Sequence, residues 1–181
     1  MLWLSTSTIV RLRDQLQARG QRPSLALPPG VSGDAAETLM VVAEYGPLAE
    51  AMYLMMSADG EVSGEEREVL KGALRNLSGD TVRGTQIESM LDSASKAIAK
   101  DGRETRMKEV ITALNEDPAR AEVAFVLAAA VAFADDAIAD EENETLNQLA
   151  DGLGIDEARA NELLDAVDKD LKENQPAPEA Q

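Results

Sequence analysis

Two short acidic stretches of the sequence carry the residue types that bind hard metal ions. The first reads ADGEVSGEE (58–66), and the second, in the C-terminal half of the chain, reads ADDAIADEE (134–142). Each has an Asp near its beginning and a Glu at the same spacing further on. Four such carboxylates facing one another would repel strongly unless a cation lay between them, and their oxygens suit Ca²⁺, Mg²⁺ or Mn²⁺. We therefore predict a divalent-cation site whose ligands are Asp59, Glu66, Asp135 and Glu142, with Asp136 as a further candidate.

The spacing of these acids differs from that of an EF-hand calcium loop. If Asp59 takes the fifth loop position, the first position falls on Met55, which has no ligand oxygen. The same alignment of the second stretch places Val131 first and Phe133 third. An EF-hand is therefore rejected, and what remains is an Asp and Glu pair that occurs twice.

A second interpretation of the same acids needs no metal. Ser63 and Glu66 have the spacing of a capping box, in which the Glu side chain accepts from the backbone N–H of the cap residue. Acidic residues in a first turn also favour the helix dipole. The second stretch has Ala139 in place of the serine, although Asp140 could cap instead. On this interpretation the acidic residues cap helices or lie on solvent-exposed helix faces, and no metal ion is bound.

The composition excludes several classes of function. The chain has no Cys and no His, which rules out disulfides, Cys/His zinc sites, catalytic triads and histidine bases. Its 34 acidic residues against 17 basic ones give a net charge of −17, which would repel nucleic acid. Any metal must therefore be held by oxygen atoms, and no nucleic-acid partner is expected.

The elements that position these acids are predicted to be helices. The chain is 44% apolar but only 3% aromatic, which favours close-packed helices over strands. We predict an all-α compact bundle of about seven to eight helices. The residue before Pro47 disfavours helix, so a break is expected at Gly46-Pro47. Beyond the N-terminal segment the expected helices span 34–45, 47–57, 63–76, 82–99, 102–115, 118–134, 140–152 and 156–172.

The chain divides into three parts. Residues 1–33 comprise an amphipathic helix and a linker rich in Pro and Gly, residues 34–172 the helical domain, and residues 173–181 a disordered tail. Superimposing the two acidic stretches also aligns apolar positions beyond them, such as Leu70 with Leu146. This matching indicates two pseudo-repeated helix-turn-helix halves related by a pseudo-twofold axis.

Neither the apolar runs nor the N-terminus of the sequence indicates a membrane span or a secretion signal. The longest apolar run, residues 123–134, is too short to cross a bilayer, which requires about 20 residues. The N-terminus lacks a basic region and a cleavage site, so a cytoplasmic location is expected. Residues 1–19 combine apolar side chains with Arg11, Arg13 and Arg19. They could rest weakly on a membrane surface or pack as the first helix of the bundle.

The two stretches also resemble the TerB-like family. The residues that carry the resemblance are A-D-G-x-V-S-x-x-E in the first copy and A-D-x-x-I-x-x-x-E in the second, within roughly 36–155. The resemblance implies a compact bundle with pseudo-symmetric halves and a metal site at Asp59, Glu66, Asp135 and Glu142. Asp136 stands where the family has a glycine, which would distort the second turn if that position needs positive φ.

The resulting functional hypothesis is a non-enzymatic module. We expect a divalent-cation-binding adaptor or sensor of a tellurite-resistance or stress-response type, with protein partners that the sequence does not identify. One alternative is a structural interaction bundle without metal. Another is a phosphoesterase in which the same acids hold Mg²⁺ or Mn²⁺, although the sequence contains no glycine-rich phosphate loop.

Overall fold

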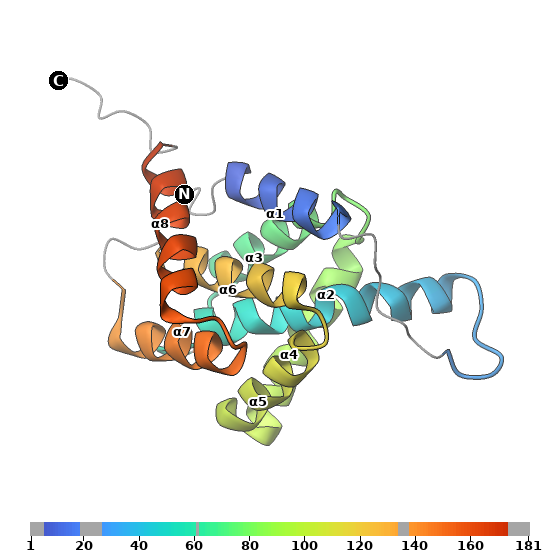
Figure 1. The fold of residues 1–181 in the computed structure, drawn as a ribbon. Coiled ribbons are helices and arrows are strands. Elements are labelled where there is room, and N and C mark those ends of the chain that lie inside the picture. The colour runs from blue at the N-terminus through green and yellow to red at the C-terminus, as the bar shows by residue number, and fades with distance from the viewer. Residues whose placement is uncertain (1–5, 19–26, 61, 134–137, 174–181) are drawn as a thin grey trace.

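The protein is an all-helical bundle. The computed structural model describes residues 6–18, 27–60, 62–133 and 138–173, and these ranges contain eight helices and no strand (Figure 1). The predicted fold class is thereby confirmed. The helices are α1 (Thr6–Ala18), α2 (Asp34–Met56), α3 (Gly64–Leu77), α4 (Gly84–Asp101), α5 (Arg103–Leu114), α6 (Pro118–Ala132), α7 (Asp140–Gly152) and α8 (Glu157–Glu173).

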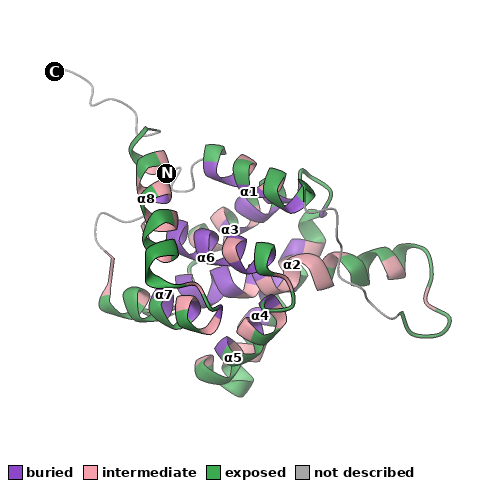
Figure 2. Ribbon diagram, in the orientation of Figure 1, coloured by how far each residue is buried: buried purple, intermediate pink, exposed green. Residues whose placement is uncertain are grey.

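Two apolar helices form the centre of the bundle. The C-terminal half of α2 and nearly all of α6 are buried, and the two helices pack against each other. A helix that is apolar all round belongs inside a protein, whereas the surrounding helices are amphipathic. Figure 2 shows the buried residues concentrated on these central elements and on the inward faces of their neighbours. The methionine-rich segment 52–56 is part of this core, as its helical spacing predicts.

The expected break at Gly46-Pro47 is wrong, because α2 continues through Pro47. Proline has no N–H, so the carbonyl of Ala43, four residues earlier, loses its helical donor. In the structure Arg120 supplies the missing donor: its Nη1 lies 2.8 Å from the Ala43 oxygen, and its Nη2 lies 2.8 Å from the Ala113 oxygen. Arg120 is only 3% exposed. A distant side chain therefore satisfies the backbone group that the proline leaves unpaired.

The helix starts follow local sequence signals. Asp117 caps α6 by accepting from the N–H groups of Ala119 and Arg120 at 3.1 and 3.4 Å, with Pro118 in the first turn. Asp156 accepts from the N–H of Arg159 at 2.9 Å ahead of α8. Both helices thus begin at an Asp, because a short polar side chain satisfies donors that the first turn leaves free.

The N-terminal helix packs on the bundle. Ile9, Leu12 and Leu16 are buried, and α1 lies against α3, α6 and α8. Thr8 donates to Asp170 on α8 at 2.6 Å, and Arg11 pairs with the same carboxylate at 3.0 Å. The apolar face of the described part of this helix is therefore buried in the core. Contact of residues 1–19 with a membrane stays an untested prediction. None of the described helices has the length and apolar character needed to cross a membrane.

Candidate functional site

The first acidic turn follows directly from the buried end of α2. Ser57 is the C-terminal cap of that helix and is buried, whereas Asp59, two positions later, is exposed. Gly60 has φ 155°, a conformation that residues with a side chain rarely adopt. The chain thus leaves the core at this turn, and Asp59 lies at the surface. The position equivalent to Gly60 in the second turn is Asp136, which lies outside the described residues.

Arg103 fixes the end of α2 from another helix. Its guanidinium group donates to the Leu54 carbonyl at 2.7 Å, the Ser57 carbonyl at 3.0 Å and the Ser57 hydroxyl at 2.8 Å. The last carbonyl groups of a helix have no internal partner, and a cation also suits this end of the helix dipole. Burial lowers the pKa of Arg103, but a guanidinium group remains charged in proteins. Arg103 therefore anchors the turn that carries Asp59.

Glu66 is part of a complete capping box. Its Oε2 accepts from the backbone N–H of Ser63 at 2.7 Å, and the Ser63 hydroxyl accepts from the N–H of Glu66 at 3.2 Å. This confirms the capping interpretation of the first stretch. Accepting one N–H does not exhaust a carboxylate, because its two oxygens can together accept about four contacts. The cap and a role as a ligand are therefore chemically compatible.

The second acidic turn follows α6 and is described only in part. Asp135 and Asp136 belong to residues 134–137, which lie outside the described residues. Glu142 reproduces half of the capping box: its Oε2 accepts from the backbone N–H of Ala139 at 2.8 Å. Asp140 is the first helical residue and not the cap, so the expectation that it replaces the serine is wrong. Ala139 has no side-chain oxygen, so only the half of the box in which the glutamate accepts from the cap N–H is formed.

The C-terminal ends of α2 and α6 lie toward the same side of the molecule. Because α2 and α6 pack together and run in a similar direction, their C-terminal ends both point to the left in Figure 1, where α7 begins. Across the described ranges, however, no group of three or more acidic side chains has the geometry to hold a metal ion. Asp59, Glu66 and Glu142 thus do not form a three-carboxylate cluster, and the full four-residue arrangement involves a segment that is not described.

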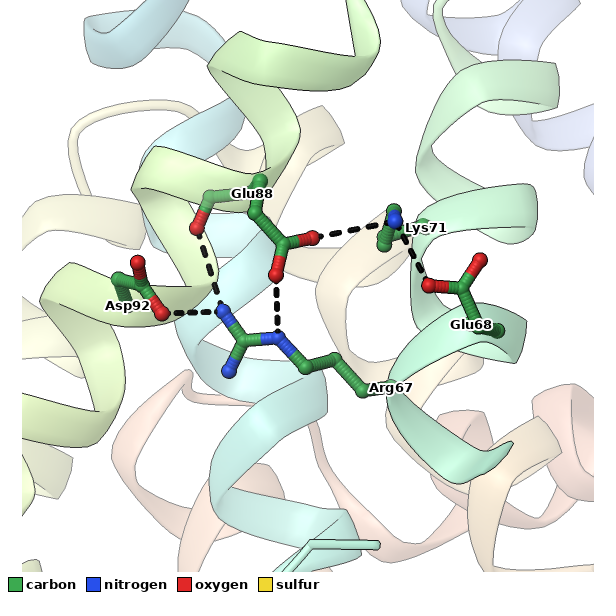
Figure 3. Close-up of polar contacts among 5 residues, drawn as sticks. All are labelled: Arg67, Glu68, Lys71, Glu88 and Asp92. Carbon is green, nitrogen blue, oxygen red and sulfur yellow. Dashed lines mark hydrogen bonds and ion pairs between the residues drawn. The ribbon is translucent and has the colours of Figure 1, made fainter. Parts of the chain in front are cut away.

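A network of charged residues that the sequence did not suggest joins α3 to α4 (Figure 3). Arg67, directly after Glu66, donates through Nε to Glu88 at 2.8 Å and through Nη2 to Asp92. Lys71 lies 3.2 Å from the other Glu88 oxygen. Hydrogen bonds from Arg67 and Lys71 lower the pKa of the Glu88 carboxyl below its ordinary value. These acids are neutralised by neighbouring cations, so their role is to hold two helices together.

Comparison with known proteins identifies a family. A family model described as tellurite resistance protein TerB matches residues 47–165, about two thirds of the chain. The matched range begins at Pro47 and contains both acidic turns, whereas α1 and the first half of α2 lie outside it. No curated protein and no solved structure matches the chain.

Proposed function

Because the chain belongs to the family of the tellurite resistance protein TerB, we propose that it is a non-enzymatic module that binds a divalent cation. In this proposal it works as an adaptor or sensor in a tellurite-resistance or related stress response. Asp59, Glu66, Asp135 and Glu142 are the ligands. Ca²⁺, Mg²⁺ and Mn²⁺ are the candidate ions, since the chain offers oxygen donors and no thiol or imidazole.

The observation that carries this proposal is that the two acidic stretches follow the C-terminal ends of α2 and α6 in the sequence. Both lie inside the family match, and they leave the ends of two central helices that pack against each other. Because α2 and α6 also run in a similar direction, their C-terminal ends lie toward one side of the molecule. Two Asp and two Glu from separate turns can then offer a hard cation several oxygens at once, with water completing its shell.

A second candidate is a structural interaction bundle without metal. It is favoured by the hydrogen bonds of Glu66 and Glu142, each of which accepts the backbone N–H that precedes its own helix. Such capping stabilises a helix start and explains Glu66 and Glu142 without any ion. The two candidates differ in whether Asp59 and Asp135, which are not needed as caps, matter for binding.

Calorimetric titration of the full chain with each ion separates the two. For the wild type we expect binding of one ion per chain at millimolar or lower concentration, together with a rise in Tm. Replacing Asp59 and Asp135 by Asn should weaken binding at least tenfold, because two of the four charged ligands become neutral.

The matched control is the pair Glu65→Gln and Glu141→Gln, which removes the same number of charges from the first turns of α3 and α7, a few residues further along each acidic stretch. It should retain binding to within about twofold, since general attraction between exposed charges is weak. Equal weakening in both double variants, or the absence of heat for all three ions, contradicts the cation proposal and favours the structural bundle.

A further inference from the structure

The sequence contains three Asp-Gly pairs, at residues 59–60, 101–102 and 151–152. The aspartate of each pair is exposed. An Asp-Gly pair can react with itself, because glycine has no side chain to block the approach of its amide nitrogen to the aspartate carboxyl carbon. The three pairs share residue type and exposure, so the backbone around each pair decides which of them reacts.

The reaction is an isomerisation through a succinimide ring. The glycine nitrogen attacks Cγ of the aspartate, the amide proton passes to the hydroxyl of the protonated carboxyl group, and this hydroxyl leaves as water. Water then adds to the main-chain carbonyl carbon of the ring and breaks the bond between that carbon and the nitrogen. The product is isoaspartate, in which the main chain runs through Cβ and Cγ. The water lost in the first step is regained in the second, and no oxidant or reductant is needed.

Two of the pairs are held by helices. Asp101 is the last residue of α4, and the N–H of Gly102 donates to the Ile98 carbonyl at 3.0 Å, which is a helical hydrogen bond. Asp151 and Gly152 both lie within α7. Ring closure requires the aspartate to leave the helical ψ and the glycine N–H to leave its acceptor, and helical pairing opposes both changes. We therefore expect these two pairs to be protected.

The pair Asp59-Gly60 is held more weakly. Helix α2 ends at Met56, and Asp59 lies in the turn that follows it. The N–H of Gly60 donates to the Ser57 carbonyl at 3.3 Å, which is longer than a usual N–H···O hydrogen bond. The same carbonyl accepts from Arg103 at 3.0 Å, so it keeps a donor when the Gly60 N–H is released. A Cβ placed on Gly60 would meet no atom of the described residues within 4 Å, so there is space for the ring.

We propose that Asp59-Gly60 is a site of succinimide and isoaspartate formation in the folded protein, whereas the other two Asp-Gly pairs are protected by their helices. The reaction involves only residues 59 and 60 and does not rest on the cation site. In the second acidic stretch the position equivalent to Gly60 is Asp136, whose side chain hinders the same attack. The two stretches therefore differ in their chemical lifetime.

The product changes the first acidic turn without changing its charge. Isoaspartate keeps one carboxylate, but this group is attached directly to Cα, and the main chain gains an additional carbon. The carboxylate of residue 59 therefore moves relative to Glu66. If Asp59 is a cation ligand, the affinity for the cation falls as the protein ages, which calorimetry of the converted chain measures. This consequence rests on the proposed function, whereas the reaction does not.

The test incubates the full chain in EDTA at a temperature well below its Tm, so that the cation site takes no part. An isoaspartyl methyltransferase with labelled S-adenosylmethionine detects isoaspartate, and peptide mapping assigns it to one of the three pairs. Residue 59 should convert faster than residues 101 and 151 by about tenfold or more, because the glycine amides of those pairs must first give up a helical hydrogen bond. In urea the three rates should converge, since unfolding removes the helices.

The matched control is Asp59→Glu, which keeps the carboxylate and the neighbouring Gly60 but requires a larger ring that closes far more slowly. This variant should show no conversion at residue 59, and circular dichroism checks that its fold persists. Equal rates at the three pairs of the folded chain would overturn the proposal. The absence of isoaspartate at residue 59 in the folded chain, when the chain in urea forms it there, would overturn the proposal too.

Discussion

At the scale of single residues, two arginines hydrogen bond to carbonyl groups of α2 that have no donor within the helix. Arg120 donates to the carbonyl that Pro47 leaves without a helical partner, and Arg103 donates to the carbonyls at the C-terminal end. Burial lowers the pKa of Arg120 against the opposing effect of Asp117 and Glu116, but the group remains charged. Hydrogen bonds from a charged donor are stronger than those between neutral groups, which makes these arginines important to the fold.

Replacing Arg120 by Met tests this role. We expect the free energy of unfolding to fall by about 2–4 kcal/mol, because the Ala43 and Ala113 carbonyls lose a charged donor inside the protein. The variant Pro47→Ala restores a backbone N–H that can reach the Ala43 carbonyl. In that background Arg120→Met should cost at least about 1 kcal/mol less, an interaction that urea unfolding of the four proteins measures as a double-mutant cycle.

The cycle contains its own control, because Arg120 also donates to Ala113, a contact that Pro47 does not influence. Arg120→Met should therefore still lower the free energy of unfolding in the Pro47→Ala background, although by less than in the wild type. Strictly additive effects of the two substitutions would show that Arg120 does not substitute for the missing helical donor.

At the scale of elements, most of the helical arrangement could be predicted from the sequence. Local signals such as Ser63, Asp117-Pro118 and Asp156 mark where helices begin, because capping involves residues close together in the chain. Local signals could not show whether the helix breaks or continues at Gly46-Pro47. The outcome depends on Arg120, which is distant in the sequence, and no local pattern reveals such a donor.

The contact between α3 and α4 depends on charge and should therefore respond to pH. Hydrogen bonds from Arg67 and Lys71 lower the pKa of Glu88 from its ordinary value of 4.5. A lowered carboxyl pKa stabilises the folded state above the ordinary value, and this contribution is lost as the pH falls through the folded pKa. Glu88→Gln should therefore lower Tm near neutral pH, and the difference from wild type should shrink below pH 4.5.

Thermal unfolding followed by circular dichroism from neutral to acidic pH measures this difference. Glu144→Gln is the control, since that exposed carboxylate accepts from the neutral amide of Gln148. Its Tm should follow that of the wild type at every pH. The Glu88 network is partly exposed to solvent, so the effect should be small and should decrease with added salt. A Tm difference independent of pH would contradict an electrostatic role for Glu88.

At the scale of the whole molecule, the candidate site was only partly predictable. The sequence identifies the acids by type and spacing, and it anticipates the capping box at Glu66. It could not indicate that Arg103 anchors the first turn, or that Glu142 caps its helix beside an alanine. Whether the turns meet is a tertiary property, and the two pseudo-symmetric halves likewise stay a prediction. The excess of negative charge favours binding of cations in general, so a specific site must be distinguished from the acidic surface.

The most direct test is NMR of the ¹⁵N-labelled chain during titration with substoichiometric Mn²⁺, which broadens the amide signals of nuclei near the bound ion. If both turns share one ion, signals of 58–66 and 138–142 should broaden together. Asp59→Asn should abolish the broadening in both turns, including the distant one, whereas Glu65→Gln should leave it intact. Broadening of one turn alone, or uniform broadening over all acidic helices, would contradict a shared cation site.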